Sequence, residues 1–225
     1  DQPTWQREFL GRWVANDSKR VYKYRPSVND YVPAADTRFG LPEAKHGYRT
    51  VIGVDFGTRD GTAIVVWAWD EYAKDLWEVY SEVRRRAIGE RLTVGEIAQW
   101  YRDVELEFGP FDGWPADPAG LATMVMDTLA DEHGVYLEPA EKKEKLDHIE
   151  LFNNDLDAGL IHIRRASALS EELLAGRWDQ AKADKGRREE DPKIPNDLTD
   201  AALYAFRWCN HRRAKVAPAV HSMFS

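Results

Sequence analysis

The chain has 225 residues, of which 43% are hydrophobic and 12% aromatic, and its formal net charge at pH 7 is −8. This length fits one sizeable domain with an extension, while the sequence shows no signal peptide, no membrane-spanning stretch and, with Cys209 as its single cysteine, no disulfide framework. The negative charge excludes a protein that coats nucleic acid by charge alone, so any contact with DNA must be local.

Residues 1–47 differ in character from the remainder of the chain. They contain Pro26, Pro33 and Pro42, and proline lacks the backbone donor that helices and sheets need. We therefore expect residues 1–47 to form an extended arm or linker packed on something larger, and residues 48–225 to form one domain.

Three strands are expected between residues 50 and 84. Residues 50–55 form a β-branched apolar run, and residues 62–69 form a second run that is apolar on both alternating faces, as in a strand covered on both sides. Residues 75–84 alternate instead, with Glu78 on the face nearer to solvent. The three runs together predict an antiparallel meander.

The rest of the chain favours helices alternating with short strands. Thr93 and Glu96 form a capping-box pattern at the start of a helix that ends before Gly109 and Pro110. Residues 182–193 are highly charged and are expected to form a mobile loop. The other expected elements are strands at 111–116, 135–137 and 159–163, and helices at 119–132, 145–156, 167–175 and 197–213.

This order of elements predicts an α/β fold whose mixed sheet, three antiparallel strands followed by parallel strands, carries helices on both faces, an arrangement that resembles ribonuclease H. In such a sheet the first strand is central and the fourth lies beside it in parallel, which would place Asp55 and Asp117 side by side at strand ends. Asp197 and Asp200 are three residues apart on one helix face. They would face the other two acids if that helix packs against the first strand.

These four aspartates are the candidate metal ligands and catalytic residues. Mg²⁺ needs hard oxygen ligands, keeps several waters and takes only a few carboxylates. Each acid also has an ordinary structural explanation, since Asp117 precedes a proline and could start a turn, and Asp197 could cap its helix in competition with Asn196. Only their joint placement favours a metal site.

With these segments the chain resembles the nuclease domain of the large terminase subunit of tailed bacteriophages. The resemblance is carried, in this order, by residues 53–57, 116–118, 145–163 and 196–205, and residues 5–14 resemble the segment that follows the motor domain of that family. Large terminases join a packaging ATPase to this nuclease, yet no G-x-x-x-x-G-K-[ST] loop occurs here. We interpret the chain as a fragment whose arm leads from a missing ATPase domain, the alternative being an ATPase on another chain.

The resemblance implies an endonuclease that cuts concatemeric viral DNA during genome packaging with two Mg²⁺ or Mn²⁺ ions. It implies that Asp55 bridges the ions, that Asp117 holds one ion and that Asp197 holds the other. Asp200 would either bind an ion directly or contact a residue that does. Its implied partners are double-stranded DNA, the portal protein and the small terminase subunit, in the cytoplasm of the host cell. We expect the isolated domain to be monomeric and not to bind membranes.

Three other functions stay open. Residues 55–58 followed by Gly61 resemble the first phosphate loop of the actin and sugar-kinase superfamily, but a second phosphate loop and an adenosine motif are not found. A non-catalytic docking module of a packaging motor would use the acids structurally and cleave nothing. A junction resolvase or transposase of the same fold would form dimers and prefer branched DNA.

The histidines and tryptophans give weaker indications. His148 and His162 have no Cys or His partners at zinc spacing, so we expect structural roles for both. Trp178 lies in a polar stretch and is a candidate for stacking on a nucleic-acid base. The residues expected in the core are Trp67, Trp69, Trp77, Trp208 and Cys209.

Overall fold

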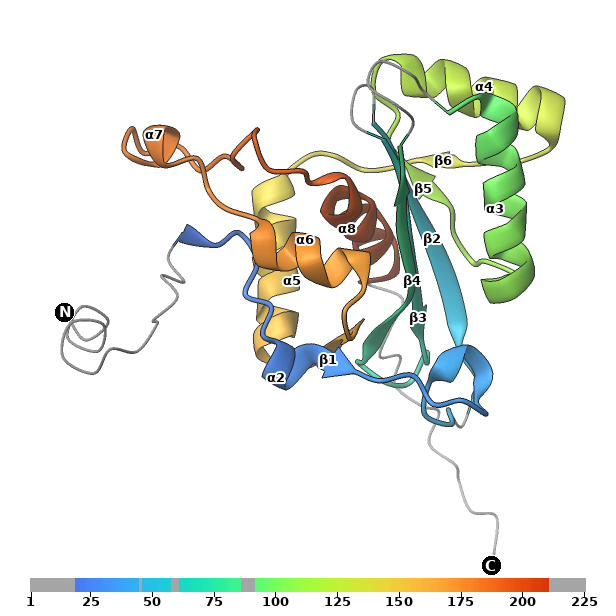
Figure 1. Cartoon of the computed structure of the whole chain (residues 1–225), viewed down its shortest axis with the longest axis horizontal. Helices are drawn as coiled ribbons and strands as arrows, with labels where there is room; N and C mark the ends of the chain where they lie inside the picture. The colour runs from blue at the N-terminus through green and yellow to red at the C-terminus, as the bar shows by residue number, and fades with distance from the viewer. Residues whose placement is uncertain (1–18, 45, 58–60, 86–91, 211–225) are drawn as a thin grey trace, which may run out of the picture.

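The computed structural model describes residues 19–44, 46–57, 61–85 and 92–210. Within these ranges the strands form one mixed sheet in the order β1-β7-β4-β3-β2-β5-β6 (Figure 1). The predicted fold class is therefore confirmed. The strands are β1 Asp30–Tyr31, β2 Arg49–Phe56, β3 Thr62–Trp69, β4 Leu76–Arg84, β5 Pro115–Ala116, β6 Glu138–Pro139 and β7 Ile161–Arg164.

The predicted meander of β2, β3 and β4 is confirmed, with both pairings antiparallel. The fourth strand in the prediction, β5, lies parallel to β2, with Val54 opposite Ala116. All of β3 is buried, as its two apolar faces predicted. Because β2 is flanked by β3 and β5, it is an inner strand, and residues that follow β2 and β5 lie at the same edge of the sheet.

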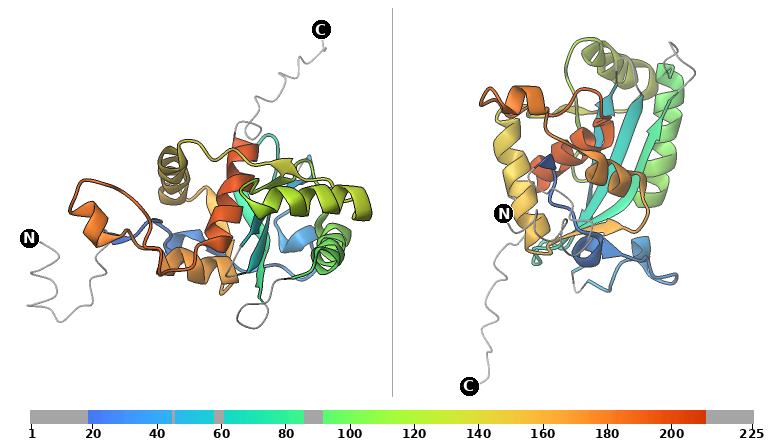
Figure 2. Two further views of the ribbon diagram at one scale, coloured as in Figure 1. Left: turned by 90° about the horizontal axis from the view of Figure 1, so that it is seen from above. Right: turned by 60° about the vertical axis from the view of Figure 1, so that its left-hand side comes forward.

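Helices cover both faces of the sheet, as two further views show (Figure 2). Alternate residues of β2 point to opposite sides, so that Val51 belongs to one hydrophobic cluster and Ile52 to the other. Helices α5, α6 and α8 supply the first cluster, and α3 and α4 supply the second. Their bounds are α3 Val94–Phe108, α4 Leu121–His133, α5 Lys145–Asp157, α6 Ala168–Ala175 and α8 Asp197–Asn210.

The short helices and the ends of the long ones follow local sequence signals. Thr93 accepts a hydrogen bond from the Glu96 backbone while the Glu96 side chain accepts one from the Thr93 backbone, so the predicted capping box is confirmed. Ser167 caps α6 in the same way, accepting from Ser170 N. The remaining helical elements are α2 Pro26–Asn29, the 3₁₀ turn η2 Arg38–Gly40 and α7 Gln180–Ala183. No described helix meets the length and apolarity that crossing a membrane requires.

The segment that precedes residue 48 contributes to the fold wherever it is described. Tyr22 and Tyr24 are buried in the cluster beneath α5 and α6, and the side chain of Asn29 donates to the carbonyls of Leu156 and Ile161. Strand β1 then pairs in parallel with β7. The sheet thus includes residues from the predicted arm, whereas the remainder of that prediction, residues 1–18, lies outside the described residues.

Several details differ from the sequence predictions. Glu78 is completely buried, because its face of β4 is covered by residues at the end of β7 and just after it: Arg164 N and Ser167 Oγ both donate to its Oε2. The strand expected at 135–137 lies at Glu138–Pro139. The charged segment 182–193 consists mostly of turns and loop, as expected, and it is anchored because Trp178 pairs with Glu190 and Asp179 N donates to Glu189 O. Trp178 itself is 9% exposed and packs in the core, so it offers no open surface to a base.

Candidate metal centre

Strand pairing brings Asp55 and Asp117 to one edge of the sheet. Asp55 is the second-last residue of β2, and Asp117 directly follows β5. The backbone N–H of Asp117 donates to the carbonyl oxygen of Val54 at 3.1 Å, which fixes the two acids in adjacent register positions. Asp55 is only 8% exposed. The predicted adjacency of these two strand ends is therefore confirmed.

Helix α8 approaches the same edge from the side of α5 and α6. Gly53 on β2 allows this approach, because a Cβ at that position would lie 2.1 Å from the carbonyl oxygen of Ala201. Asp197 and Asp200 occupy the first turn of the helix, and Asp197 is 8% exposed. The predicted packing of the last helix on the first strand is thus confirmed, and it carries both acids toward Asp55.

The pKa of Asp55 reflects the charges of the other three acids. Burial, followed by the negative charges of Asp200, Asp117 and Asp197 in that order, raises the pKa of Asp55 to about 8. Such a shift needs like charges within a short range in a site with little water. The Asp55 carboxylate receives no hydrogen bond from any residue in the described part of the chain. It is therefore the least compensated member of the cluster.

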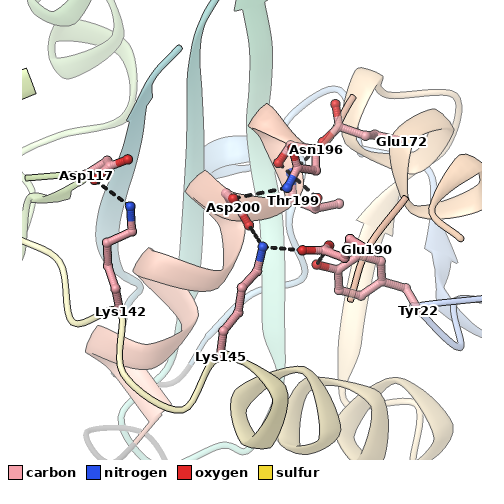
Figure 3. A network of polar contacts seen from close by, with 9 residues as sticks. All are labelled: Tyr22, Asp117, Lys142, Lys145, Glu172, Glu190, Asn196, Thr199 and Asp200. Atoms are coloured by element: carbon pink, nitrogen blue, oxygen red, sulfur yellow. Dashed lines mark hydrogen bonds and ion pairs between the residues drawn. The ribbon is translucent and has the colours of Figure 1, made fainter. Parts of the chain in front are cut away.

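Basic side chains neutralise the other three acids. Lys142 Nζ lies 2.8 Å from Asp117 Oδ1, Arg85 Nη2 lies 3.1 Å from Asp197 Oδ2, and Lys145 Nζ lies 2.5 Å from Asp200 Oδ1. Figure 3 shows Lys142 and Lys145 reaching the acids from the segment at the start of α5. Each of these three acids is thus paired with a cation of the chain itself.

Lys145 is shared between two carboxylates. Its ammonium group also pairs with Glu190, whose other oxygen accepts from Tyr22 Oη at 3.5 Å (Figure 3). Burial lowers the pKa of Lys145, but Asp200 and Glu190 outweigh it and leave the pKa raised. Burial raises the pKa of Asp200 to about 6, although the charge of Lys145 opposes this shift. The Lys145 bridge therefore favours the charged form of Asp200 and holds it in place.

The first turn of α8 is held by a residue that the sequence did not indicate. Glu172 of α6 accepts a hydrogen bond from Thr199 N at 2.7 Å, and burial raises the pKa of Glu172 to about 7. Asn196 Nδ2 donates to Asp200 Oδ2 at 3.2 Å. The N–H of Thr199 belongs to the first turn of α8 and has no acceptor within the helix, so Glu172 supplies the acceptor that a helix-capping side chain would otherwise provide. Asp117 does keep its structural role, because its Oδ1 accepts from Ala119 N at 2.7 Å.

The donor set fits a hard divalent cation by its chemistry. The four acids offer carboxylate oxygens, which are the ligands that Mg²⁺ and Mn²⁺ take. No three acidic, histidine or cysteine side chains in the described part of the chain are close enough together to form a finished metal site. Asp117, Asp197 and Asp200 are instead each paired with a cation of the chain, namely Lys142, Arg85 and Lys145.

The expected structural roles of the histidines also have a physical basis. His162 stacks on Trp77 with ring centroids 3.7 Å apart, and its Nε2 lies 2.8 Å from Asp75 Oδ1. His148 lies on α5 beside Arg207, at the wall of a cavity.

The basic runs that contain Arg85 and the two lysines Lys142 and Lys145 are visible in the sequence, but the sequence does not indicate which acid each cation pairs with. The spacing of the two lysines around the start of α5 was the available signal for them. Glu190, which shares Lys145 with Asp200, gave no signal at all.

The fold is shared with solved structures of phage packaging proteins. The large terminase of a thermophilic bacteriophage matches with a TM-score of 0.65 and 18% identity, over 83% of this chain and 44% of that protein. The nuclease domain of the SPP1 large terminase, solved with bound Mn, matches with a TM-score of 0.54 and 23% identity, over 73% of this chain and 88% of that domain. The large terminase nuclease of phage G20c, solved with bound magnesium, matches with a TM-score of 0.60 and 15% identity. This match covers 84% of this chain and 97% of that nuclease.

These similarities confirm the predicted resemblance at the level of the fold, which is that of terminase nuclease domains. The chain spans less than half the length of the first of these proteins, the large terminase of a thermophilic bacteriophage. No protein-family model and no curated protein matches the sequence.

Proposed function

We propose that this chain is a nuclease domain that cuts double-stranded DNA during viral genome packaging, by hydrolysis with two divalent metal ions. The observation that carries the proposal is the convergence of Asp55, Asp117, Asp197 and Asp200 at one edge of a sheet whose fold matches terminase nucleases. Structures with this fold have been solved with Mn and with magnesium, which supports the choice of Mg²⁺ or Mn²⁺.

The chain's own residues would divide the work as follows. Asp55, whose pKa the charges of the other three acids raise, would contact both ions. Asp117 would hold one ion, and Asp197 would hold the other, with Asp200 as a second ligand or as the partner of a ligand. Bound ions of this kind activate a water molecule and stabilise the leaving oxygen. Lys142, Lys145 and Arg85 hold the acids in place before metal binds and would be displaced from them as it does.

The proposal extends to the setting of the reaction. The substrate would be concatemeric viral DNA in the cytoplasm of the host cell, and the portal protein and small terminase subunit would be the partners. An ATPase domain upstream of residues 1–47, or on another chain, would move the DNA. In isolation we expect the domain to be a monomer, which size-exclusion chromatography with light scattering checks.

The direct test is cleavage of supercoiled plasmid with Mn²⁺ or Mg²⁺ by Asp55→Ala. We expect the unsubstituted chain to nick and linearise the plasmid, and Asp55→Ala to lose at least about 100-fold in rate because a ligand shared by both ions is gone. Asp103→Ala is the matched control, since Asp103 is exposed on α3 on the opposite face of the sheet. Isothermal titration with Mn²⁺ should show the same contrast in binding.

Other outcomes would assign other functions. A chain that binds no Mn²⁺ and cleaves no DNA would be a docking module with structural acids. Preference for four-way junctions over linear duplex, together with a dimer in solution, would identify a resolvase or transposase. Full activity in Asp55→Ala would contradict the proposed metal centre.

A further inference from the structure

A cavity of about 250 Å³ adjoins the acid cluster on the side of α5 and α8. Asp200 and Tyr204 form the part of its wall that is shared with the cluster, because the charges of Asp200, Asp55 and Asp117 all raise the pKa of Tyr204 after burial. The remainder of the wall is mostly basic. Its lining residues are Lys142, Lys145, His148, Asp200, Leu203, Tyr204 and Arg207.

Among the described residues, Arg207 is the cation of this cavity that makes no ion pair, although Glu141 and Glu144 act on it as more distant charges. Its Nη2 donates to the backbone carbonyl of Lys143, its Nε is buried without a hydrogen-bond partner, and no carboxylate in the described part of the chain forms an ion pair with it. Arg49 shows the usual arrangement, since its guanidinium is held by Glu71 and Asp112. Burial lowers the pKa of Arg207 more than the charges of Glu141 and Glu144 raise it, so an anion that joined the guanidinium would offset the remaining cost of burial.

The two lysines of the cavity are already paired with acids, and one of them, Lys142, could leave its partner. Lys145 is neutralised by Asp200 and Glu190, and Lys142 by Asp117. Lys142 Nζ also lies 5.9 Å from the centroid of the Tyr204 ring, so the lysine stands between the cluster and the cavity. A divalent ion on Asp117 would repel this ammonium group. The cavity would then hold two cations, Arg207 and Lys142, that make no ion pair.

We propose that this cavity is a phosphate subsite. It binds a phosphodiester group that neighbours the cleaved phosphodiester in the DNA strand. The inference rests on the proposed function and deepens it. Arg207 is the main ligand, because a guanidinium presents donors in a planar fork that matches two phosphate oxygens. His148 is a further basic residue of the same wall. The subsite positions the strand and carries no part of the hydrolysis.

The test measures binding of a fluorescent 20-base-pair duplex by anisotropy in metal-free buffer with EDTA, over a range of salt concentrations. Each phosphate contact contributes about 0.9 to the slope of log K against log salt concentration. We expect Arg207→Gln to reduce that slope by about 1, and Arg207→Lys to keep the slope while binding more weakly, because a lysine is a point charge. Arg207→Met, which keeps the apolar stem, replaces Arg207→Gln if the glutamine variant melts early.

Arg102→Gln is the matched control. Arg102 is exposed on α3, and its Nη2 donates to the backbone carbonyl of His133, so it makes the same kind of contact on the opposite face of the sheet. We expect this variant to keep the slope of the unsubstituted chain. An Arg207→Gln variant that also keeps the slope would overturn the subsite.

A second arm locates the phosphate. Duplexes with one neutral methylphosphonate at successive positions around the cleavage site should reveal one position at which the unsubstituted chain loses affinity and Arg207→Gln does not. Equal sensitivity of both proteins at every position would overturn the proposal. Because binding is read without metal, these results are independent of cleavage: a chain that never cuts DNA with Mn²⁺ refutes the proposed function, whereas a normal slope in Arg207→Gln refutes the subsite alone.

Discussion

Ala201 lies against Gly53 so closely that the carbonyl oxygen of Ala201 is 2.1 Å from the point where a Cβ on Gly53 would stand. This contact sets how near α8 comes to β2, and α8 carries Asp197 and Asp200. The glycine of the GVDFG segment therefore serves helix packing, two residues before the acid that the helix faces.

Replacing Gly53 with alanine should destabilise the fold by about 3 kcal/mol, because backbone cannot give way as a flexible side chain does. Helix α8 would move outward and separate its acids from Asp55, so Mn²⁺-dependent cleavage should fall as well. Urea unfolding measures the first effect. Gly95→Ala is the control, since a Cβ at Gly95 on α3 meets only His133 at 3.8 Å and should leave stability unchanged or raise it by up to about 1 kcal/mol.

Asp117→Asn should separate function from stability. The asparagine oxygen can still accept from Ala119 N, and the ion pair with Lys142 is partly exposed, so we expect a change in unfolding free energy within about 1 kcal/mol. Cleavage should fall at least about 100-fold, because a neutral amide is a poor ligand for Mg²⁺. Asp179→Asn is the control. Asp179 Oδ1 accepts from Ala181 N just as Asp117 Oδ1 accepts from Ala119 N, but Asp179 is not one of the four acids, so this variant should cleave normally. A large loss of stability in Asp117→Asn would mark Asp117 as mainly structural.

Lys145→Gln should destabilise the chain by about 1 to 2 kcal/mol. The substitution leaves Asp200 and Glu190 close together without the cation between them, and partial exposure of Lys145 limits the cost. Thermal and urea unfolding at pH 7 measure the change. Lys182→Gln removes a lysine that pairs with Glu189 on an exposed turn, and it should show no resolvable difference. Equal stability of the two variants would contradict the bridging role of Lys145.

Glu78 should make stability depend on pH. Burial raises the pKa of Glu78 from 4.5 to about 7, although hydrogen bonds from Ser81, Ser167 and Arg164 oppose the shift. The folded chain therefore favours the protonated acid, and this stabilisation is complete below pH 4.5 and lost as the pH rises through about 7.

Glu78→Gln, which stays neutral, should gain about 2 to 3 kcal/mol in stability relative to the unsubstituted chain as the pH rises from about 5 to about 8. Urea unfolding at the two pH values measures this difference. Glu150→Gln, at an exposed acid that pairs with Arg188, should show no such trend. A difference for Glu78→Gln that is the same at both pH values would refute the raised pKa.

Much of the fold follows from local patterns in the sequence. The period-2 runs of β2 and β3 and the capping box at Thr93 are strong signals, and they were located to within a residue or two. The order of these elements was enough to predict which strands lie together. It was also enough to predict that Asp55 and Asp117 end adjacent strands.

The parts that sequence did not provide depend on tertiary contacts. Glu78 sits in an alternating strand pattern, and only its contacts with Arg164 and Ser167 show that its face of the strand is covered. Trp178 and the charged segment after it pack because Lys19 and Arg177 lie alongside, a pairing with no local signature. The cations that neutralise the acids are missed for the same reason. Lysines are common on surfaces, and only the folded chain shows that Lys142 and Lys145 reach Asp117 and Asp200.

The two acids carried by α8 also set when the proposed centre can exist. A chain emerging from the ribosome delivers Asp55 and Asp117 early, yet β2 cannot be covered until the residues up to Asn210 are released and α8 docks on Gly53. Until then only Asp55 and Asp117 are in place, and the side of the site that α8 forms is missing. If the proposed metal centre is correct, a nascent polypeptide would therefore be unable to cut DNA until α8 has docked on β2.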